Sequence, residues 1–257
     1  MMAFIRQSIG TYKAFSWPPD YTELLLDKVI NPIWFIALFH FLARYTVPDR
    51  NPFEIIIAVA VLFAGAQTAL RAPEGFRAEA ETHVLPNLVL SARQLPYLIA
   101  VRLIPVFIEC VAVLLAAFVV GLVLYGGGIS PAQSLTALLY GLLALVSLCS
   151  LGFLFAALSL LFDDYVLISN LCWSVIILFS GALFPASIYP DGWGWQLVQF
   201  AVPGNAALAG LQNTLANNPT DVSPAIYLAR EAVVCVVITF IATRIFDRGV
   251  RHRLEQI

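Results

Sequence analysis

The sequence predicts an all-α integral membrane protein with six transmembrane helices, an amino-terminal interfacial helix and an extracellular re-entrant helical hairpin before the last span. Of its 257 residues, 60% are hydrophobic and 12% are charged. Several apolar stretches are long enough to cross about 30 Å of hydrocarbon. A soluble fold of this size would need more polar surface. Residues 1–257 are therefore expected to form a single transmembrane domain.

The first element is expected over residues 1–17, where apolar residues recur on one face of a helix. Such a helix would lie along the inner leaflet, with its apolar face in the headgroup region. Gly10 weakens helical structure. A short disordered tail is therefore the alternative for this segment.

Six apolar stretches follow as candidate transmembrane spans. They cover residues 24–45, 53–70, 97–125, 132–162, 166–184 and 224–246. The third and fourth are longer than a bilayer requires, so they must tilt, kink or extend beyond it. Pro105 offers a kink in the third stretch, and Pro32 offers one in the first.

The basic residues divide unevenly between the two sides of these spans. The two termini and the connection after the second span are expected on one side of the membrane, and eleven of the 14 Lys and Arg residues fall on that side. The other three are Arg44, Arg50 and Arg230. Basic residues are retained on the cytoplasmic side of a membrane. The chain is therefore expected in the plasma (inner) membrane, with both termini in the cytoplasm.

The connection between the second and third spans, residues 72–96, combines acidic residues with a short amphipathic stretch. The residues that carry this pattern are Glu79, Glu81, Leu85, Leu88 and Ser91. A short helix parallel to the membrane is the expected structure, and its apolar face would need lipid or a protein partner. An ordinary surface loop is the alternative.

Residues 185–205, between the fifth and sixth spans, are rich in proline, glycine and aromatic residues. The prolines and glycines require the chain to turn there. Two short helices that dip into the outer leaflet would satisfy their own backbone and bury the rings. The residues singled out are Phe184, Pro185, Tyr189, Trp193 and Trp195. For any single ring, an aromatic belt without a transport role is the alternative.

Four ionisable residues are predicted to lie within the hydrocarbon, where charge is costly unless it faces protein or water. They are Glu109 in the third span, His40 in the first, and the pair Arg230 and Glu231 near the outer end of the sixth. Glu109 has three possible roles: a hydrogen bond between spans, the lining of a transport route, or proton coupling. Arg102 lies about 10 Å from Glu109 along a helix, so we expect it to extend to the inner headgroups. No catalytic residue and no metal site are expected, because the histidines lack neighbours at ligand spacing.

Two regions resemble motifs of the transmembrane permease subunits of type-2 ABC exporters, and the resemblance extends over the whole chain. The coupling pattern of that family, approximately E-x-E-x-G-T-L-x-x-L-x-x-S-P, is similar to residues 79–92. His83, Val84 and Ala92 stand where Gly, Thr and Pro are usual. The family signature S-G-x-x-F-P…P…P is similar to residues 180–203.

The resemblance implies an ATP-driven export permease, paired with a second copy of this chain or with a similar permease. The sequence contains no G-x-x-x-x-G-K-[ST] phosphate loop. It is therefore not expected to be an enzyme by itself, and ATP and Mg²⁺ would be bound by a separate nucleotide-binding subunit. That subunit would grip residues 72–96, and residues 185–205 would form an outer gate. Membrane lipids are expected partners, and nucleic acid is not.

An amphiphilic or hydrophobic cargo, such as a drug, natural product or lipid conjugate, suits the short external loops and the aromatic side chains. Export of a lipid-linked glycan or polysaccharide by the same mechanism stays open, because aromatic rings also stack on sugars. Two other classes of membrane protein are the remaining alternatives. A secondary transporter or channel would show gradient-driven flux without an ATPase. A membrane-embedded lipid-modifying enzyme would turn over its substrate as an isolated chain.

Overall fold

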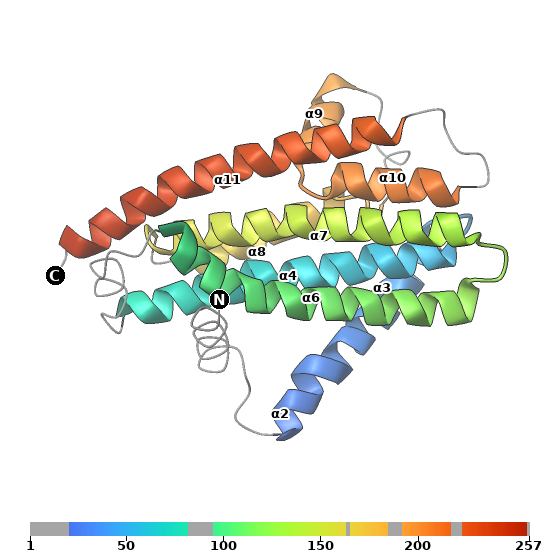
Figure 1. The fold of residues 1–257 in the computed structure, drawn as a ribbon, viewed down its shortest axis with the longest axis horizontal. Coiled ribbons are helices and arrows are strands. Elements are labelled where there is room, and N and C mark those ends of the chain that lie inside the picture. Colours follow the sequence, from blue (N-terminus) through green and yellow to red (C-terminus); the bar gives the residue numbers. More distant parts are fainter. Residues whose placement is uncertain (1–20, 82–94, 163–164, 185–191, 217–222, 256–257) are drawn as a thin grey trace.

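The computed structural model describes residues 21–81, 95–162, 165–184, 192–216 and 223–255, which form helices joined by short connections (Figure 1). The elements in chain order are α2 (Tyr21–Leu25), a π-helical turn η1 (Leu26–Ile30), α3 (Asn31–Thr46), α4 (Pro52–Glu81), α6 (Leu95–Tyr125), α7 (Pro131–Ser159), α8 (Tyr165–Phe179), α9 (Trp193–Ala201), α10 (Asn205–Leu215) and α11 (Pro224–Glu255). The predicted interfacial helix, residues 1–17, lies outside the described residues.

Five helical segments in this part of the chain are long and apolar enough to cross a membrane. They are Leu26–Thr46, Pro52–Glu74, Val101–Tyr125, Pro131–Ser159 and Pro224–Gly249. Helix α8, at the predicted fifth span, has 15 residues, which correspond to about 22 Å of helix. The chain is a multi-pass helical membrane protein with five helices of spanning length, whereas the sequence predicts six.

Helix α4 forms the centre of the bundle. Every residue from Phe53 to Ala66 is buried, and the helix packs mainly against α6 and α7, between which it lies in Figure 1. These residues are apolar on all sides of the helix except at Glu54. A helix that is hydrophobic all round is expected to be surrounded by other helices.

Helices α3 and α11 lie at the periphery and expose much of their apolar surface. Trp34 and Phe41 of α3 and Val236 and Phe240 of α11 are more than half exposed. Apolar side chains on the outside of a soluble bundle would be unfavourable, but here they suit contact with lipid or with another membrane helix.

The first span contains an irregular turn where the sequence predicts one. Pro32 has no N–H to donate along the helix, and the turn before it widens so that the Asn31 N–H donates to the carbonyl of Leu26. This widened turn carries two charged residues, Asp27 and Lys28, within a largely apolar span. Proline therefore changes the backbone here in a way that positions charge.

Two helices run past the ends that hydropathy predicts. Helix α4 continues through Pro73 to Glu81, although its predicted span ends at residue 70. Residues 72–81 of the predicted connection 72–96 therefore belong to α4. Helix α11 continues to Glu255, beyond residue 246. The extension of α4 is rich in Ala, Glu and Arg, which favour helix. The extension of α11 contains Arg248, Arg251 and Arg253. Both are too polar to count as membrane span.

Two short helices, α9 and α10, lie between α8 and α11, and their bounds differ from the predicted hairpin of residues 185–205. Helix α10 begins only at Asn205 and packs against α7 and α11. Gly204 precedes it with a φ of 84°, a conformation that glycine adopts without strain. A Cβ added to Gly210 would lie 2.5 Å from the ring of Tyr140. Helix α10 is thus a closely packed layer that is too short for a hydropathy scan to detect.

Candidate functional site

The first of two polar clusters lies at the end of the bundle where α4 begins. This Arg50 cluster comprises Arg50, Glu54, Gln212 and the backbone carbonyls of residues 181–183. Arg50 Nε donates to Glu54 Oε2 at 3.2 Å, and Arg50 Nη2 donates to Glu54 Oε1. The two side chains are 6% and 4% exposed. They therefore form a bidentate ion pair that is almost fully removed from water.

Backbone carbonyls occupy the remaining donors of Arg50. Nη1 donates to the carbonyls of Ala182 and Leu183, both at 3.0 Å, and Nη2 donates to the carbonyl of Gly181 at 3.4 Å. A guanidinium has five N–H groups in a fixed fork. Each of the five has an acceptor here, two from Glu54 and three from the chain after α8. The ion pair therefore holds that chain segment against the start of α4.

Local sequence explains why Arg50 and Glu54 meet. The Asn51 side chain accepts a hydrogen bond from the Phe53 N–H at 3.0 Å, and Pro52 occupies the first position of α4. Both features favour the start of a helix. Glu54 then lies four residues after Arg50, and its charge is favourable in the first turn of a helix.

Helix α10 is tied to the same place by side-chain amides. Gln212 Nε2 donates to the carbonyl of Gly181 at 2.8 Å, and Asn205 Nδ2 donates to the carbonyl of Phe179 at 2.9 Å. Asn51 Nδ2 reaches the carbonyl of Leu215 at 3.5 Å. Polar side chains therefore satisfy the backbone carbonyls that the end of α8 leaves without helical partners.

Residues Arg230 and Glu231 of α11 organise the start of α10. Glu231 is 1% exposed, and its two oxygens accept hydrogen bonds from the N–H groups of Gly204 at 2.6 Å and Ala207 at 3.1 Å. A carboxylate at a helix amino terminus satisfies free N–H groups and opposes the helix dipole. Arg230 Nη2 donates to Asn205 Oδ1 at 3.1 Å. These contacts give the pair a structural role.

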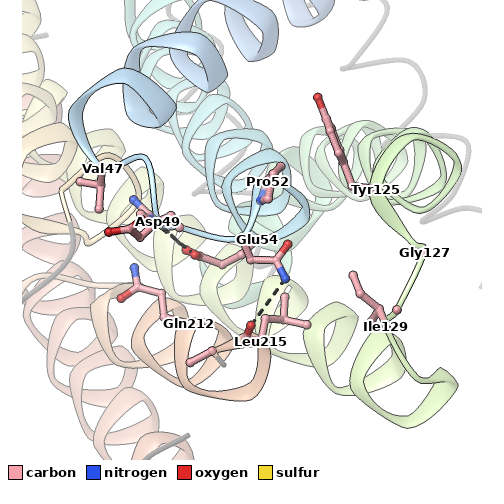
Figure 2. Close-up of a pocket in the computed structure, with 13 residues that line it drawn as sticks. Val47, Asp49, Pro52, Glu54, Tyr125, Gly127, Ile129, Gln212 and Leu215 are labelled. Carbon is pink, nitrogen blue, oxygen red and sulfur yellow. Dashed lines mark hydrogen bonds and ion pairs between the residues drawn. The ribbon is translucent and has the colours of Figure 1, made fainter. Parts of the chain in front are cut away.

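A cavity of about 640 Å³ opens beside the Arg50 cluster. Figure 2 shows Glu54 of α4 and Gln212 of α10 on its wall, with Tyr125 and the glycine turn after α6 opposite them. The residues that line the cavity are Val47, Asp49, Arg50, Asn51, Pro52, Glu54, Tyr125, Gly127, Gly128, Ile129, Gln212, Leu215 and Ala216. Charged, amide and aliphatic groups therefore share one space at this end of the bundle.

The second cluster, the Glu109 cluster, comprises Asp27, Lys28, Arg71 and Glu109. Lys28 Nζ lies 2.6 Å from Glu109 Oε1, and Arg71 Nη1 lies 3.1 and 3.2 Å from the two Glu109 oxygens. Arg71 Nη2 also lies 2.5 Å from Asp27 Oδ2. The side chains are between 14% and 32% exposed. These side-chain contacts join η1, α4 and α6.

The two clusters lie far apart along the bundle. Glu109 precedes Tyr125 by 16 residues of α6, which is about 24 Å of helix. Tyr125 lines the cavity beside the Arg50 cluster. The clusters are therefore separated by most of the thickness of a hydrocarbon core. Among the described residues, no three His, Cys, Asp or Glu side chains lie together as metal ligands would.

His40 is 5% exposed and stacks on Tyr125, with ring centroids 5.7 Å apart. Neither of its ring nitrogens has a hydrogen-bond partner in the part of the chain that the structure describes. A buried polar group without a partner is unfavourable. The imidazole therefore packs here as an aromatic ring.

The residues predicted for partner coupling fall at the edge of the described structure. Glu79 and Glu81 end helix α4, whereas Leu85, Leu88 and Ser91 lie outside the described residues. The acidic pair is thus the helical end of α4, and the sequence had predicted it in a connection.

The residues predicted around the hairpin are dispersed. Phe184 packs against the core, whereas Trp193, at the start of α9, is 79% exposed. Trp195 follows within α9, and Pro185 and Tyr189 lie outside the described residues. The structure therefore does not bring Phe184 and Trp193 together in one buried gate.

Sequence reasoning missed Glu54 and Gln212, and it did not pair Glu109 with Lys28 and Arg71. The spacing of four residues between Arg50 and Glu54 was a signal for the first pair. No local pattern points to Gln212, which reaches the cluster only because α10 folds back. No protein-family model matches the chain, and no curated protein was found that matches it.

Proposed function

We propose that the chain is the transmembrane subunit of an ATP-binding cassette exporter of the type-2 kind. It would move an amphiphilic or hydrophobic substrate across the plasma membrane, driven by a separate ATPase subunit that binds ATP and Mg²⁺. The observation that carries the proposal is the continuity of α4. One 30-residue helix connects the Arg50 cluster with Glu79 and Glu81, and its length of about 45 Å exceeds that of a hydrocarbon core.

A buried helix of this kind suits the transmission of movement. Close-packed interiors are poorly compressible, so a displacement at one end of a packed helix is felt at the other. A partner that pushes on the Glu79 and Glu81 end would act on the Arg50 cluster, which holds residues 181–183 and α10. Arg71, on the same helix, would carry the movement to Glu109 of α6.

In this proposal α8 is the fifth of six spans, and α9 and α10 form the re-entrant hairpin on the outer side. Support comes from the two ends of α10. Gly204 lies beside Ala144, about 20 Å along α7 from its start. Thr214 accepts a hydrogen bond from Gln133 Nε2 at 3.4 Å in the first turn of α7. Helix α10 would therefore rise from the middle of the bilayer to its surface.

The orientation rests on the distribution of basic residues, which favours a cytoplasmic location for both termini. The exposed apolar faces of α3 and α11 leave room for a second permease chain. A pair of chains would then enclose the transport route, and two ATPase subunits would move them relative to each other.

The test is to isolate the tagged chain in mild detergent from its native membrane and to assay the ATPase activity of what elutes. We expect a stoichiometric ATPase. The double charge reversal Glu79→Lys and Glu81→Lys should weaken docking of the ATPase, because it removes charge complementarity at the interface. We expect ATPase recovery or stimulation to fall about tenfold, which corresponds to about 1.4 kcal/mol of binding free energy. Membrane insertion should be unchanged. Asp247→Lys, an exposed site on α11, is the matched control.

A double variant that couples as well as the unaltered chain would contradict this docking surface. Recovery of the chain without any ATPase would contradict the exporter itself. Gradient-driven flux would then favour a secondary transporter or channel, and turnover of lipid by the isolated chain would favour an enzyme.

A further inference from the structure

We propose that the cavity beside the Arg50 cluster binds the cationic amine group of an amphiphilic ligand, with the Asp49 carboxylate as its counter-ion. That this ligand is the transported substrate rests on the function proposed above. The binding itself follows from the charges and donors around the cavity.

The cavity has the dimensions of a small-molecule site. Its volume of about 640 Å³ falls within the range of about 300 to 1,000 Å³ that is typical for such sites. Its wall comes from three separate parts of the chain: the connection before α4, the turn after α6 and the end of α10. A site at the meeting point of several helices would respond to their relative movement.

Arg50 is the positive charge on this wall, but it has no capacity left for an anion. All five of its N–H groups donate to Glu54 or to the carbonyls of residues 181–183. A carboxylate or phosphate ligand would have to displace acceptors from a pair that is almost fully buried. The geometry therefore disfavours an anionic ligand.

Asp49 is the charge that remains. It lines the cavity, it is exposed, and it makes no hydrogen bond or ion pair with any residue that the structure describes. Since Arg50 and Glu54 neutralise each other, the described residues of the lining carry a formal charge of −1 from Asp49. An ammonium group is attracted by this charge without giving up any existing contact.

The remaining lining residues complement an amine with an apolar tail. Gln212 uses Nε2 to donate to Gly181, and its carbonyl oxygen can accept from an N–H of the ligand. Tyr125 lines the cavity as well. Val47 and Leu215 provide aliphatic surface beside these groups. Charge, acceptor and apolar wall together specify an amphiphilic cation.

Binding can be measured on the full chain alone, reconstituted in phosphatidylcholine nanodiscs that carry no net lipid charge. The probes are dansylcadaverine, which has a terminal ammonium, and dansylglycine, which has the same fluorophore with a carboxylate. Empty nanodiscs correct for partition into lipid. We expect the amine probe to bind more tightly than the carboxylate probe, and 0.5 M NaCl to weaken it by screening.

Asp49→Asn should weaken binding of the amine probe about fivefold, as expected for loss of an exposed charge pair, and should leave dansylglycine unchanged. Asp247→Asn, which removes an exposed charge from α11, is the matched control and should bind as the unaltered chain does. Equal binding of the two probes, or equal effects of the two substitutions, would overturn the site.

The assay separates this site from the proposed function because it needs no ATPase. Amine binding that depends on Asp49, in a chain that recovers no ATPase, would support the site and contradict the exporter. Recovery of a coupled ATPase, without Asp49-dependent binding of the amine probe, would contradict the proposed site and would still agree with the exporter proposal.

Discussion

The Arg50 cluster and the Glu109 cluster both join helices through an Arg–Glu pair, but they do so in different ways. Arg50 has one carboxylate partner and three backbone carbonyls, and the pair is nearly inaccessible to water. Glu109 is shared by Lys28 and Arg71, which also contact Asp27, and these side chains are partly exposed. The first cluster holds backbone carbonyls, whereas the contacts within the second are between side chains.

The difference has consequences for movement. Backbone carbonyls cannot turn away without refolding of the segment that carries them, so the Arg50 contacts have one geometry. Side chains that exchange partners within a cluster of two acids and two bases can accommodate a shift between helices. We infer that the Arg50 cluster anchors the structure, and that the Glu109 cluster is where η1, α4 and α6 can move relative to one another.

The largest effect is expected from Arg50→Ala. It removes the counter-ion of the buried Glu54 carboxylate and leaves the carbonyls of Ala182 and Leu183 without their Arg50 donor, and breaking a buried pair costs about 3–5 kcal/mol. The free energy of unfolding, measured by SDS titration in lipid micelles with far-ultraviolet circular dichroism, should fall by about this amount. Arg44→Ala, at an exposed site in the last turn of α3, is the matched control and should have little effect.

A double variant, Arg50→Met with Glu54→Leu, sharpens this test. If the ion pair alone mattered, an apolar replacement of both partners would restore stability. Because Arg50 also donates to residues 181–183, we expect only partial recovery. Full recovery would show that the carbonyl contacts contribute nothing.

A smaller effect is expected from Glu109→Gln. Asp27 still pairs with Lys28 and Arg71 in this variant, which leaves one uncompensated positive charge. The side chains concerned are 14–20% exposed, so water reduces the cost to about 1 kcal/mol. The same SDS titration measures it, with Glu109→Ala for comparison. A loss as large as that of Arg50→Ala would remove the distinction between the two clusters.

The smallest effect, with the opposite sign, is expected from His40→Phe. His40 is 5% exposed, yet its ring nitrogens have no partners among the described residues. Phenylalanine keeps the stacking on Tyr125 and removes the buried polar atoms, so stability should rise by about 1 kcal/mol. A marked destabilisation in the SDS titration would mean that the His40 imidazole has a polar partner. It would contradict the view that a buried imidazole is tolerated here without a hydrogen bond.

Hydropathy predicted the long helices well because a membrane span has a strong local signal. The predicted stretches 97–125 and 132–162 correspond closely to α6 and α7. The π-helical turn before Pro32 was likewise predictable from the missing N–H of proline. Helix α10 was missed because eleven residues of mixed polarity have no such signal.

The site was predicted less completely than the fold. Glu109 and His40 stood out because ionisable residues are rare in apolar stretches. Their surroundings could not be derived, since Lys28 and Arg71 reach Glu109 from helices that are distant in sequence. Sequence reasoning located individual charges, but it did not identify which charges compensate one another.

Composition and periodicity therefore sufficed for the class of protein, for the long helices and for the charges that interrupt them, because each of these depends on neighbours along the chain. Other features arise only after the helices pack: the central position of α4, the return of α10 to the start of α4, the five filled donors of Arg50, and the Asp49 carboxylate, which has no partner among the described residues. Packing places residues from distant segments within hydrogen-bond distance, and no local pattern encodes those distances.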